Sequence, residues 1–129
     1  MIWLAAHLAR LPEWAAHALQ LDSLDLSPNG VPMPQPAIPK SSKELFQEFD
    51  KNVKLGRSAI AASSDADLIN PGRYSIMGKF YSACRVASVC ANGFLNHNVH
   101  HRAQLGVYLR LNNIPVPALY GSSADEQGM

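Results

Sequence analysis

The side chains best suited to chemistry lie in residues 96–104, which read NHNVHHRAQ. On a helix, residues four apart lie one turn above each other on one face, so His97 and His101 direct both imidazoles at one point. This is the spacing of a two-histidine metal clamp. His100 lies about 100° round the helix from His101. We therefore interpret His100 as a flanking residue and not as a ligand.

The same spacing also occurs in helices that bind no metal, where a buried histidine is hydrogen-bonded to a carbonyl or to water. A third ligand separates the two interpretations, because a catalytic zinc-type site uses three protein ligands and leaves one position open. His7 is the candidate, since it lies beside Leu4, Leu8 and Leu11 in an apolar N-terminal stretch. Three imidazoles in an apolar core would otherwise lack polar partners, which is costly.

Two helices are predicted to position these histidines. Apolar residues at three- and four-residue steps predict the first over residues 1–19, interrupted at Pro12 because proline removes a backbone donor. The last helix is predicted over about residues 82–112, ended by Pro115 and Pro117. Its inner stripe carries His97 and His101 together with Ala83, Ala87, Cys90, Phe94, Leu105 and Tyr108.

A crossover loop and a further helix are predicted between these two. Residues 21–40 hold five prolines, too many for a helix or a central strand, and therefore form a long connection. Ser41 and Glu44 have the spacing of a capping box, which begins a helix that ends near Ser63. Its predicted buried stripe is Leu45, Phe49, Val53, Gly56 and Ile60. A short turn follows at residues 64–68, and residues 73–80 are expected to be irregular or weakly extended.

Length and composition narrow the class of protein. The 129 residues fit a single domain, residues 1–129. Eleven basic and ten acidic side chains, with no basic cluster, argue against nucleic acid or an anionic membrane as partner. Cys84 and Cys90 share one predicted helix and are poorly placed for a disulfide. Sparse cysteine, no apolar stretch near 20 residues, and an N-terminus interrupted by His7 and Arg10 predict a reduced, soluble, cytoplasmic protein without a signal peptide.

Three motifs resemble one family along essentially the whole chain. They are WLAAHLA at residues 3–9 with Pro12 and Trp14, NHxxHHRxQL at residues 96–105, and IPVPxxYG at residues 114–121. Together they are similar to the DinB/YfiT-like metalloenzymes, the DinB superfamily. The resemblance implies an all-α fold, an up-down four-helix bundle with one long crossover. It also implies a divalent metal held by three histidines, which fall here on His7, His97 and His101.

The chain departs from this family pattern in two places. Ala103 stands where the family usually has glycine, a change that favours a helix. The family's first helix, which precedes the histidine-bearing one, has no counterpart, and the predicted first helix begins without an N-cap residue. We therefore expect either an N-terminally truncated domain or a homodimer in which a neighbouring subunit covers the open apolar groove, since such a groove promotes aggregation in a monomer.

The expected cofactor is a divalent metal ion. Three neutral imidazoles suit Zn²⁺ or Ni²⁺, with Fe²⁺ and Mn²⁺ bound more weakly. Around the clamp, Gln104 or Tyr108 could orient a ligand, although surface solvation and helix packing explain them equally well. Cys90 fits better as a small buried apolar residue than as a pocket group, and His17 is taken as a non-ligand.

The resemblance implies a metal-dependent thiol transferase or hydrolase. Its partners would be a low-molecular-weight thiol and an electrophilic small molecule, and no dedicated acid or base can be named. One alternative is a non-catalytic metal-binding protein, a stress-related structural or oligomeric bundle. Another is a catalytically silent copy that retains the histidine set.

Overall fold

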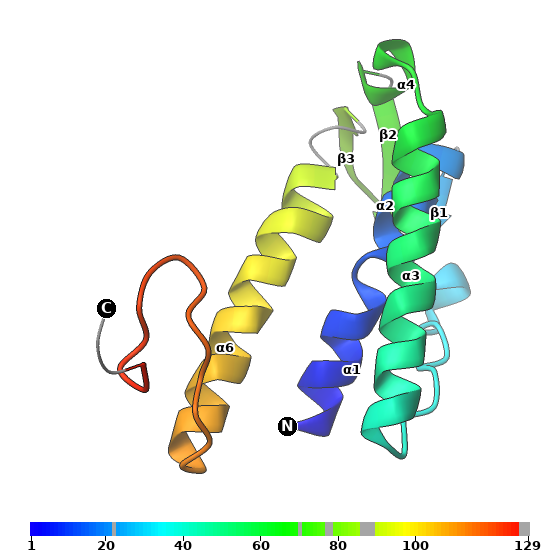
Figure 1. The fold of residues 1–129 in the computed structure, drawn as a ribbon. Coiled ribbons are helices and arrows are strands. Elements are labelled where there is room, and N and C mark those ends of the chain that lie inside the picture. The colour runs from blue at the N-terminus through cyan, green and yellow to red at the C-terminus, as the bar shows by residue number, and fades with distance from the viewer. Residues whose placement is uncertain (22, 70, 77–78, 86–89, 127–129) are drawn as a thin grey trace.

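The structure is a computed structural model that describes residues 1–21, 23–69, 71–76, 79–85 and 90–126. Figure 1 shows α1 lying between α3 and α6, in agreement with the packing of α1 against both helices. The described elements, in chain order, are α1 (Ile2–Arg10), α2 (Glu13–Gln20), β1 (Ser23–Asp25), the 3-10 turn η1 (Pro28–Gly30), α3 (Ser42–Ala62), α4 (Asp65–Ile69), β2 (Pro71–Ile76), β3 (Lys79–Arg85), the π-helical segment η2 (Cys90–Asn96) and α6 (His97–Leu111).

The predicted predominance of helix is confirmed, but a small sheet departs from a purely α-helical chain. Its strand order is β1-β2-β3, with β1 parallel to β2 and β2 antiparallel to β3. Ser23 lies opposite Arg73, and Pro71 lies opposite Arg85. Residues 73–80 are expected from the sequence to be irregular or weakly extended, and their described part, residues 73–76 and 79–80, lies in paired strands.

The prediction of one helix over residues 82–112 is wrong at its beginning. Residues 82–85 belong to β3, and the next described residues, from Cys90, form the π-helical segment that leads into α6. Backbone pairing with β2, which in turn pairs with the distant β1, decides the conformation of this segment, and local apolar spacing cannot foresee it. Ala83 therefore lies in a strand, and Ala87 lies outside the described residues, as do the side chains of Cys84 and Cys90.

The first layer is formed by α1 and α2 packed on α3. The predicted interruption at Pro12 is confirmed, because α1 ends at Arg10 and α2 begins at Glu13. A Cβ atom on Gly56 would collide with the carbonyl oxygen of Pro12, so glycine lets α3 approach the kink closely. Apart from prolines and Gly56, the buried apolar residues in the described part of the chain are six alanines and one leucine: Ala6, Ala9, Leu11, Ala15, Ala16, Ala18 and Ala59.

The predicted buried stripe of α3 is only partly correct. Gly56 is buried, but Phe49 and Ile60 are 40% and 46% exposed. The face that α3 turns toward α1 and α2 instead carries Asn52 and Ala59. Small side chains on that face let the helices approach closely, and this leaves the larger apolar residues of α3 at the edge of the contact.

Specific polar contacts fix this layer. The amide nitrogen Nδ2 of buried Asn52 donates to the carbonyl of Ala9 at 3.0 Å. Arg10 donates from Nε to Glu48 at 2.6 Å and from Nη2 to the carbonyl of Ala37, which ties the crossover loop down. The predicted cap of α3 is present, since the Glu44 amide donates to Ser41 Oγ at 3.2 Å.

The chain reverses direction after α6. Asn113 has φ of 55°, in the left-handed region, and its amide donates to the Arg110 carbonyl while the Ile114 amide donates to that of Leu109. The tail then runs back beside α6, as Figure 1 shows. Arg102 Nη2 donates to the Tyr120 hydroxyl at 2.5 Å, which fastens the returning tail to the helix.

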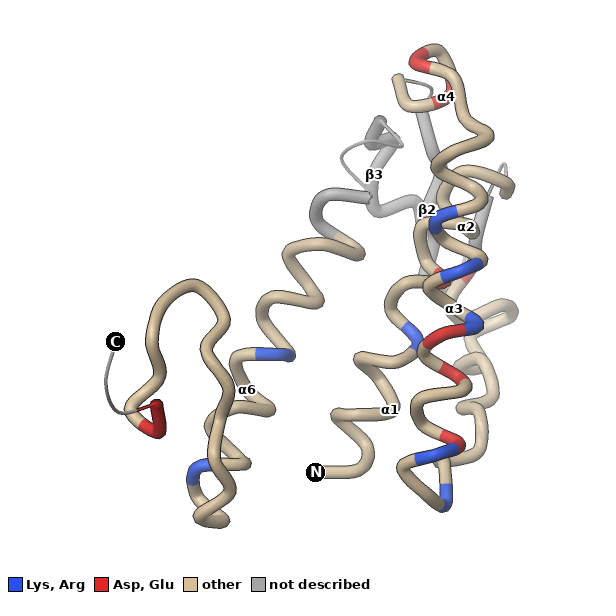
Figure 2. The backbone as a smooth tube through the Cα atoms, in the orientation of Figure 1, with Lys and Arg blue, Asp and Glu red and all other residues tan. Residues whose placement is uncertain are grey.

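Charge differs between the two outer helices. Figure 2 shows acidic and basic residues mixed along α3, whereas α6 carries Arg102 and Arg110 and no carboxylate. Arg110 is paired across the reversal with Asp125 of the tail at 2.8 Å. Among the described helices, none combines the length and the apolar character needed to cross a bilayer.

Candidate metal centre

Three histidines meet where α1 packs on α6. His7 comes from α1, and His97 and His101 come from the first turns of α6. Nε2 of His7 lies 3.3 Å from Nε2 of His97, a residue 90 positions away in sequence. Nε2 of His97 lies 2.7 Å from Nε2 of His101. The three half-buried rings each offer one ligand atom, all within 4.8 Å of one another, so this group could hold a metal ion.

The spacing of these nitrogens fits a single ion. Two imidazole nitrogens bound to one tetrahedral zinc ion at about 2.0–2.1 Å lie roughly 3.3 Å apart. The His7–His97 pair has this separation, and the His97–His101 pair is closer, so small ring movements would accommodate one cation. A neutral imidazole carries one N–H, and each close Nε2 pair can share only one proton. A cation instead satisfies all three lone pairs at once.

Hydrogen bonds on the far side of the rings set their tautomers. His101 Nδ1 lies 2.7 Å from Gln104 Oε1 and must donate to it, because a carbonyl oxygen only accepts. His97 makes a hydrogen bond to the Gly93 backbone that raises its pKa, as donation from the ring does. Since Nε2 of His97 faces the other rings, Nδ1 is the donor. Metal-binding histidines typically donate their second N–H in this way.

The surroundings also favour the neutral form of two rings. Burial lowers the pKa of His7, and the neighbouring His101, His97 and Arg10 lower it further. Burial likewise lowers the pKa of His97, with His101 adding to the effect and the Gly93 hydrogen bond opposing it. Neutral imidazole is the form that binds a cation. These rings are therefore prepared for ligation at neutral pH.

The remaining histidines lie outside the cluster, as the spacing predicts. His100 is exposed, and its ring centroid lies 4.9 Å from that of His101 in an edge-on arrangement. His17 lies on α2, where Nε2 is 3.9 Å from a carboxylate oxygen of Glu13. Neither belongs to the group of possible ligands found among the described residues.

The two candidate supporting residues differ. Gln104 contacts a ring of the cluster directly, whereas Tyr108 is 50% exposed and has no side-chain contact with the cluster in the described part of the chain. Sequence reasoning missed the role of Gly93. Its position four residues before His97 was the available signal, since a helical side chain can reach the backbone of the preceding turn. The π-helical turn that contains Gly93 is a feature often found at functional sites.

Comparisons with known proteins add no family to this geometry. The chain matches no protein-family model, no curated protein and no solved structure. Its chemistry is therefore judged from the donor set: three converging imidazoles, two of them with their second nitrogen held by an acceptor.

Proposed function

We propose that this protein binds a divalent metal ion through His7, His97 and His101. The observation that carries the proposal is the convergence of three Nε2 atoms from two helices, with acceptors at Gln104 and Gly93 on the opposite ring nitrogens. Zn²⁺ or Ni²⁺ suits three neutral imidazoles best, and Fe²⁺ or Mn²⁺ less well.

The DinB/YfiT-like family is the proposed context of this site. The motifs around the histidines and in the Pro-Val-Pro and Tyr-Gly tail support it, as does the layered arrangement of α1–α2, α3 and α6. A four-helix bundle with one crossover would contain one helix in addition to the α1–α2 pair, α3 and α6.

The proposed reaction is metal-dependent transfer of a low-molecular-weight thiol to an electrophile, or hydrolysis. His7, His97 and His101 would hold the cation, which would lower the pKa of coordinated water toward about 7 or deprotonate a coordinated thiol and so supply a nucleophile at neutral pH. The three histidines are half-buried, not enclosed in the core. Gln104 holds the His101 ring in the ligating tautomer, and Arg10, one turn after His7 on α1, helps to keep His7 neutral.

Metal content after alanine substitution tests the ligand set. Wild-type protein dialysed against Zn²⁺ or Ni²⁺ should retain one ion per chain by elemental mass spectrometry. His7→Ala, His97→Ala and His101→Ala should each lose it, while His100→Ala and His17→Ala serve as matched controls and should keep it. Circular dichroism checks that each variant is folded. Full metal content in folded His97→Ala and His101→Ala proteins would refute the proposed ligands.

A second candidate function is a non-catalytic metal site that only fastens helices. One observation favours it: no side chain of α6 is fully buried, so an ion between His7 and the α6 histidines would strengthen this contact. Incubating metal-loaded protein with a panel of biological thiols and monochlorobimane separates the two. Turnover that disappears in His101→Ala supports the enzyme, and metal retention without turnover across the panel supports the structural site.

A further inference from the structure

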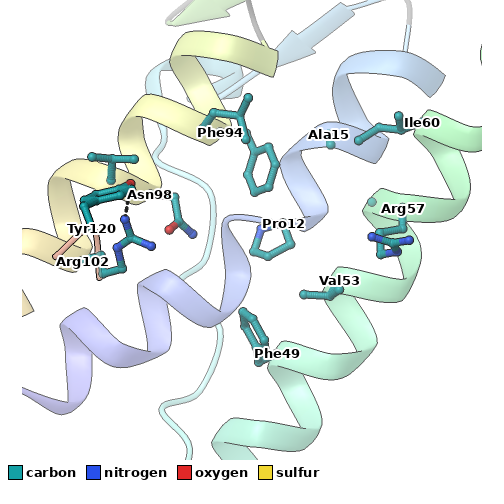
Figure 3. Close-up of a pocket in the computed structure, with 13 residues that line it drawn as sticks. Pro12, Ala15, Phe49, Val53, Arg57, Ile60, Phe94, Asn98, Arg102 and Tyr120 are labelled. Carbon is teal, nitrogen blue, oxygen red and sulfur yellow. Dashed lines mark hydrogen bonds between the residues drawn. The ribbon is translucent and has the colours of Figure 1, made fainter. Parts of the chain in front are cut away.

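A cavity separate from the histidines lies between α3 and α6, beside the kink between α1 and α2. Its volume is about 320 Å³, within the range of roughly 300–1,000 Å³ typical of small-molecule sites. Figure 3 shows Phe49 and Val53 extending from α3, Phe94 from the η2 segment that leads into α6, and Pro12 from the kink between α1 and α2. The walls are therefore largely apolar.

The apolar side chains that line the cavity are partly exposed to solvent. Phe49 and Ile60 of α3 are 40% and 46% exposed, and Val99 of α6 is 45% exposed. These three residues line the cavity from opposite sides. An occupant with an apolar body that removes them from water is favoured by the hydrophobic effect.

The charged groups that line the cavity are all positive. They are Arg57 and Arg102, which lie there with Asn98 and Tyr120, and no aspartate or glutamate is among the described lining residues. Asn98 and Arg102 are one turn apart on α6 and therefore share a face, as Figure 3 shows. Their end of the cavity offers amide and guanidinium donors without a compensating carboxylate.

These donors are available to a ligand. The Asn98 side chain is half-buried and has no hydrogen-bond partner among the described residues. Arg102 donates to the Tyr120 hydroxyl from Nη2, and a guanidinium has five N–H groups, so others remain. The Tyr120 ring also lies 5.1 Å from the Arg102 guanidinium carbon, which steadies that side chain at the cavity wall.

We propose that this cavity binds a small amphipathic carboxylate, with an alkyl or aromatic body between α3 and α6 and the carboxylate at Asn98 and Arg102. A planar guanidinium pairs with a carboxylate through two parallel hydrogen bonds. A cationic amphiphile would instead be repelled by Arg57 and Arg102. The site uses none of the three histidines, so it goes beyond the proposed metal function and does not depend on it.

Calorimetric titration with octanoate, octan-1-ol and octylammonium tests the recognition of the carboxylate. Octanoate should bind one per chain, more tightly than the alcohol, and octylammonium should bind least. Arg102→Gln should weaken octanoate binding about tenfold or more and leave the alcohol nearly unchanged. Asn98→Asp is the second variant and should also weaken octanoate binding, because it places a carboxylate at the head-group position. Equal affinity for octanoate and octan-1-ol would overturn the proposal.

Two controls keep this site distinct from the metal centre. Lys54→Gln, on the exposed surface of α3 outside the cavity lining, should bind octanoate as the wild type does. His97→Ala should lose metal and still bind octanoate, so failure of the metal proposal would leave this result untouched. Loss of octanoate binding in Lys54→Gln, or no loss in folded Arg102→Gln, would contradict the assignment.

Sedimentation equilibrium tests whether a second copy fills the cavity instead. A monomer near the 14.0 kDa chain mass that binds one octanoate supports the ligand site. A stable particle of twice that mass that Val99→Glu dissociates and that octanoate does not bind would overturn it. The cavity would then be an interface between two copies of the chain.

Discussion

The two faces of α1 are held by different forces. Toward α3, the α1–α2 pair presents alanines and Leu11, buried almost completely, and meets a helix that has glycine at the closest approach. Toward α6, it presents His7, and no side chain of α6 is buried as completely as these alanines are. The contact of the α1–α2 pair with α3 is stabilised by close packing of buried apolar side chains. The contact of α1 with α6 is stabilised by the three-histidine cluster. The attachment of α6 should therefore depend on what the three imidazoles bind.

The largest expected effect is the increase in the free energy of unfolding when the protein binds metal. An ion that binds only the folded protein should stabilise it by about 2.7 kcal/mol when its free concentration is a hundred times its Kd. Amide hydrogen exchange should slow most in α6 and α1 and change least in α3 at low metal occupancy. His101→Ala should show neither effect. Equal protection of α3 and α6, at every level of loading, would contradict the distinction between the two contacts.

Substitution at Gly56 should weaken the contact of the α1–α2 pair with α3. Gly56→Ala places a methyl group against the Pro12 carbonyl and should cost about 1–3 kcal/mol in the free energy of unfolding, measured by urea denaturation. Gly106→Ala is the matched control, because its new Cβ would lie 3.7 Å from Val116 Cγ1, an ordinary contact. Alanine is a better helix former than glycine, so this variant should be neutral or slightly stabilised. Equal destabilisation in both variants would refute the close approach.

Gln104 should affect the contact of α1 with α6 alone. Gln104→Leu removes the acceptor that fixes His101 and should weaken metal affinity about tenfold, measured by chelator competition. Gln104→Glu keeps an acceptor at this position and should retain most of the affinity. The unfolding free energy of the metal-free protein should hardly change in either variant, because Gln104 is exposed. Unchanged metal affinity in the leucine variant would exclude the orienting role.

Acid should weaken the contact of α1 with α6 gradually. The pKa values of His7 and His97 lie below the ordinary value of 6.5, so below that pH the unfolded chain takes up protons before the folded one. Stability of the metal-free protein should therefore be complete above 6.5, fall as the pH drops below it, and level off below the folded pKa values. Denaturation midpoints in a pH series measure this, and His97→Gln should flatten the dependence. Stability that rises on acidification would contradict the lowered pKa values.

The features that sequence could predict are those set locally. The i,i+4 spacing placed His97 and His101 together, the Ser41 cap began α3, and Pro12 divided the first helix. His7 could be proposed as a third ligand because its helix is apolar. The bound metal and the reaction are predictions that the metal-content and thiol-turnover experiments test, and the family stays a prediction.

The features that sequence missed depend on distant partners. The apolar stripe of α3 marked a face that prefers to leave water, but it could not say that Phe49 and Ile60 would border a cavity while Asn52 met α1. Strand β3 arises in the same way, because its backbone finds β2 instead of extending the helix. An apolar pattern indicates which residues prefer to be buried, but the neighbouring elements determine which of them actually become buried.

The backbone conformation of Asn113 determines the direction of the carboxyl-terminal segment. Left-handed backbone suits asparagine and glycine and is strongly disfavoured for branched side chains. This torsion angle reverses the chain, so that the carboxyl-terminal segment runs back along α6 and places Tyr120 beside Arg102. The rim of the α3–α6 cavity thus includes a segment whose direction is fixed by backbone geometry at position 113, away from the cavity itself.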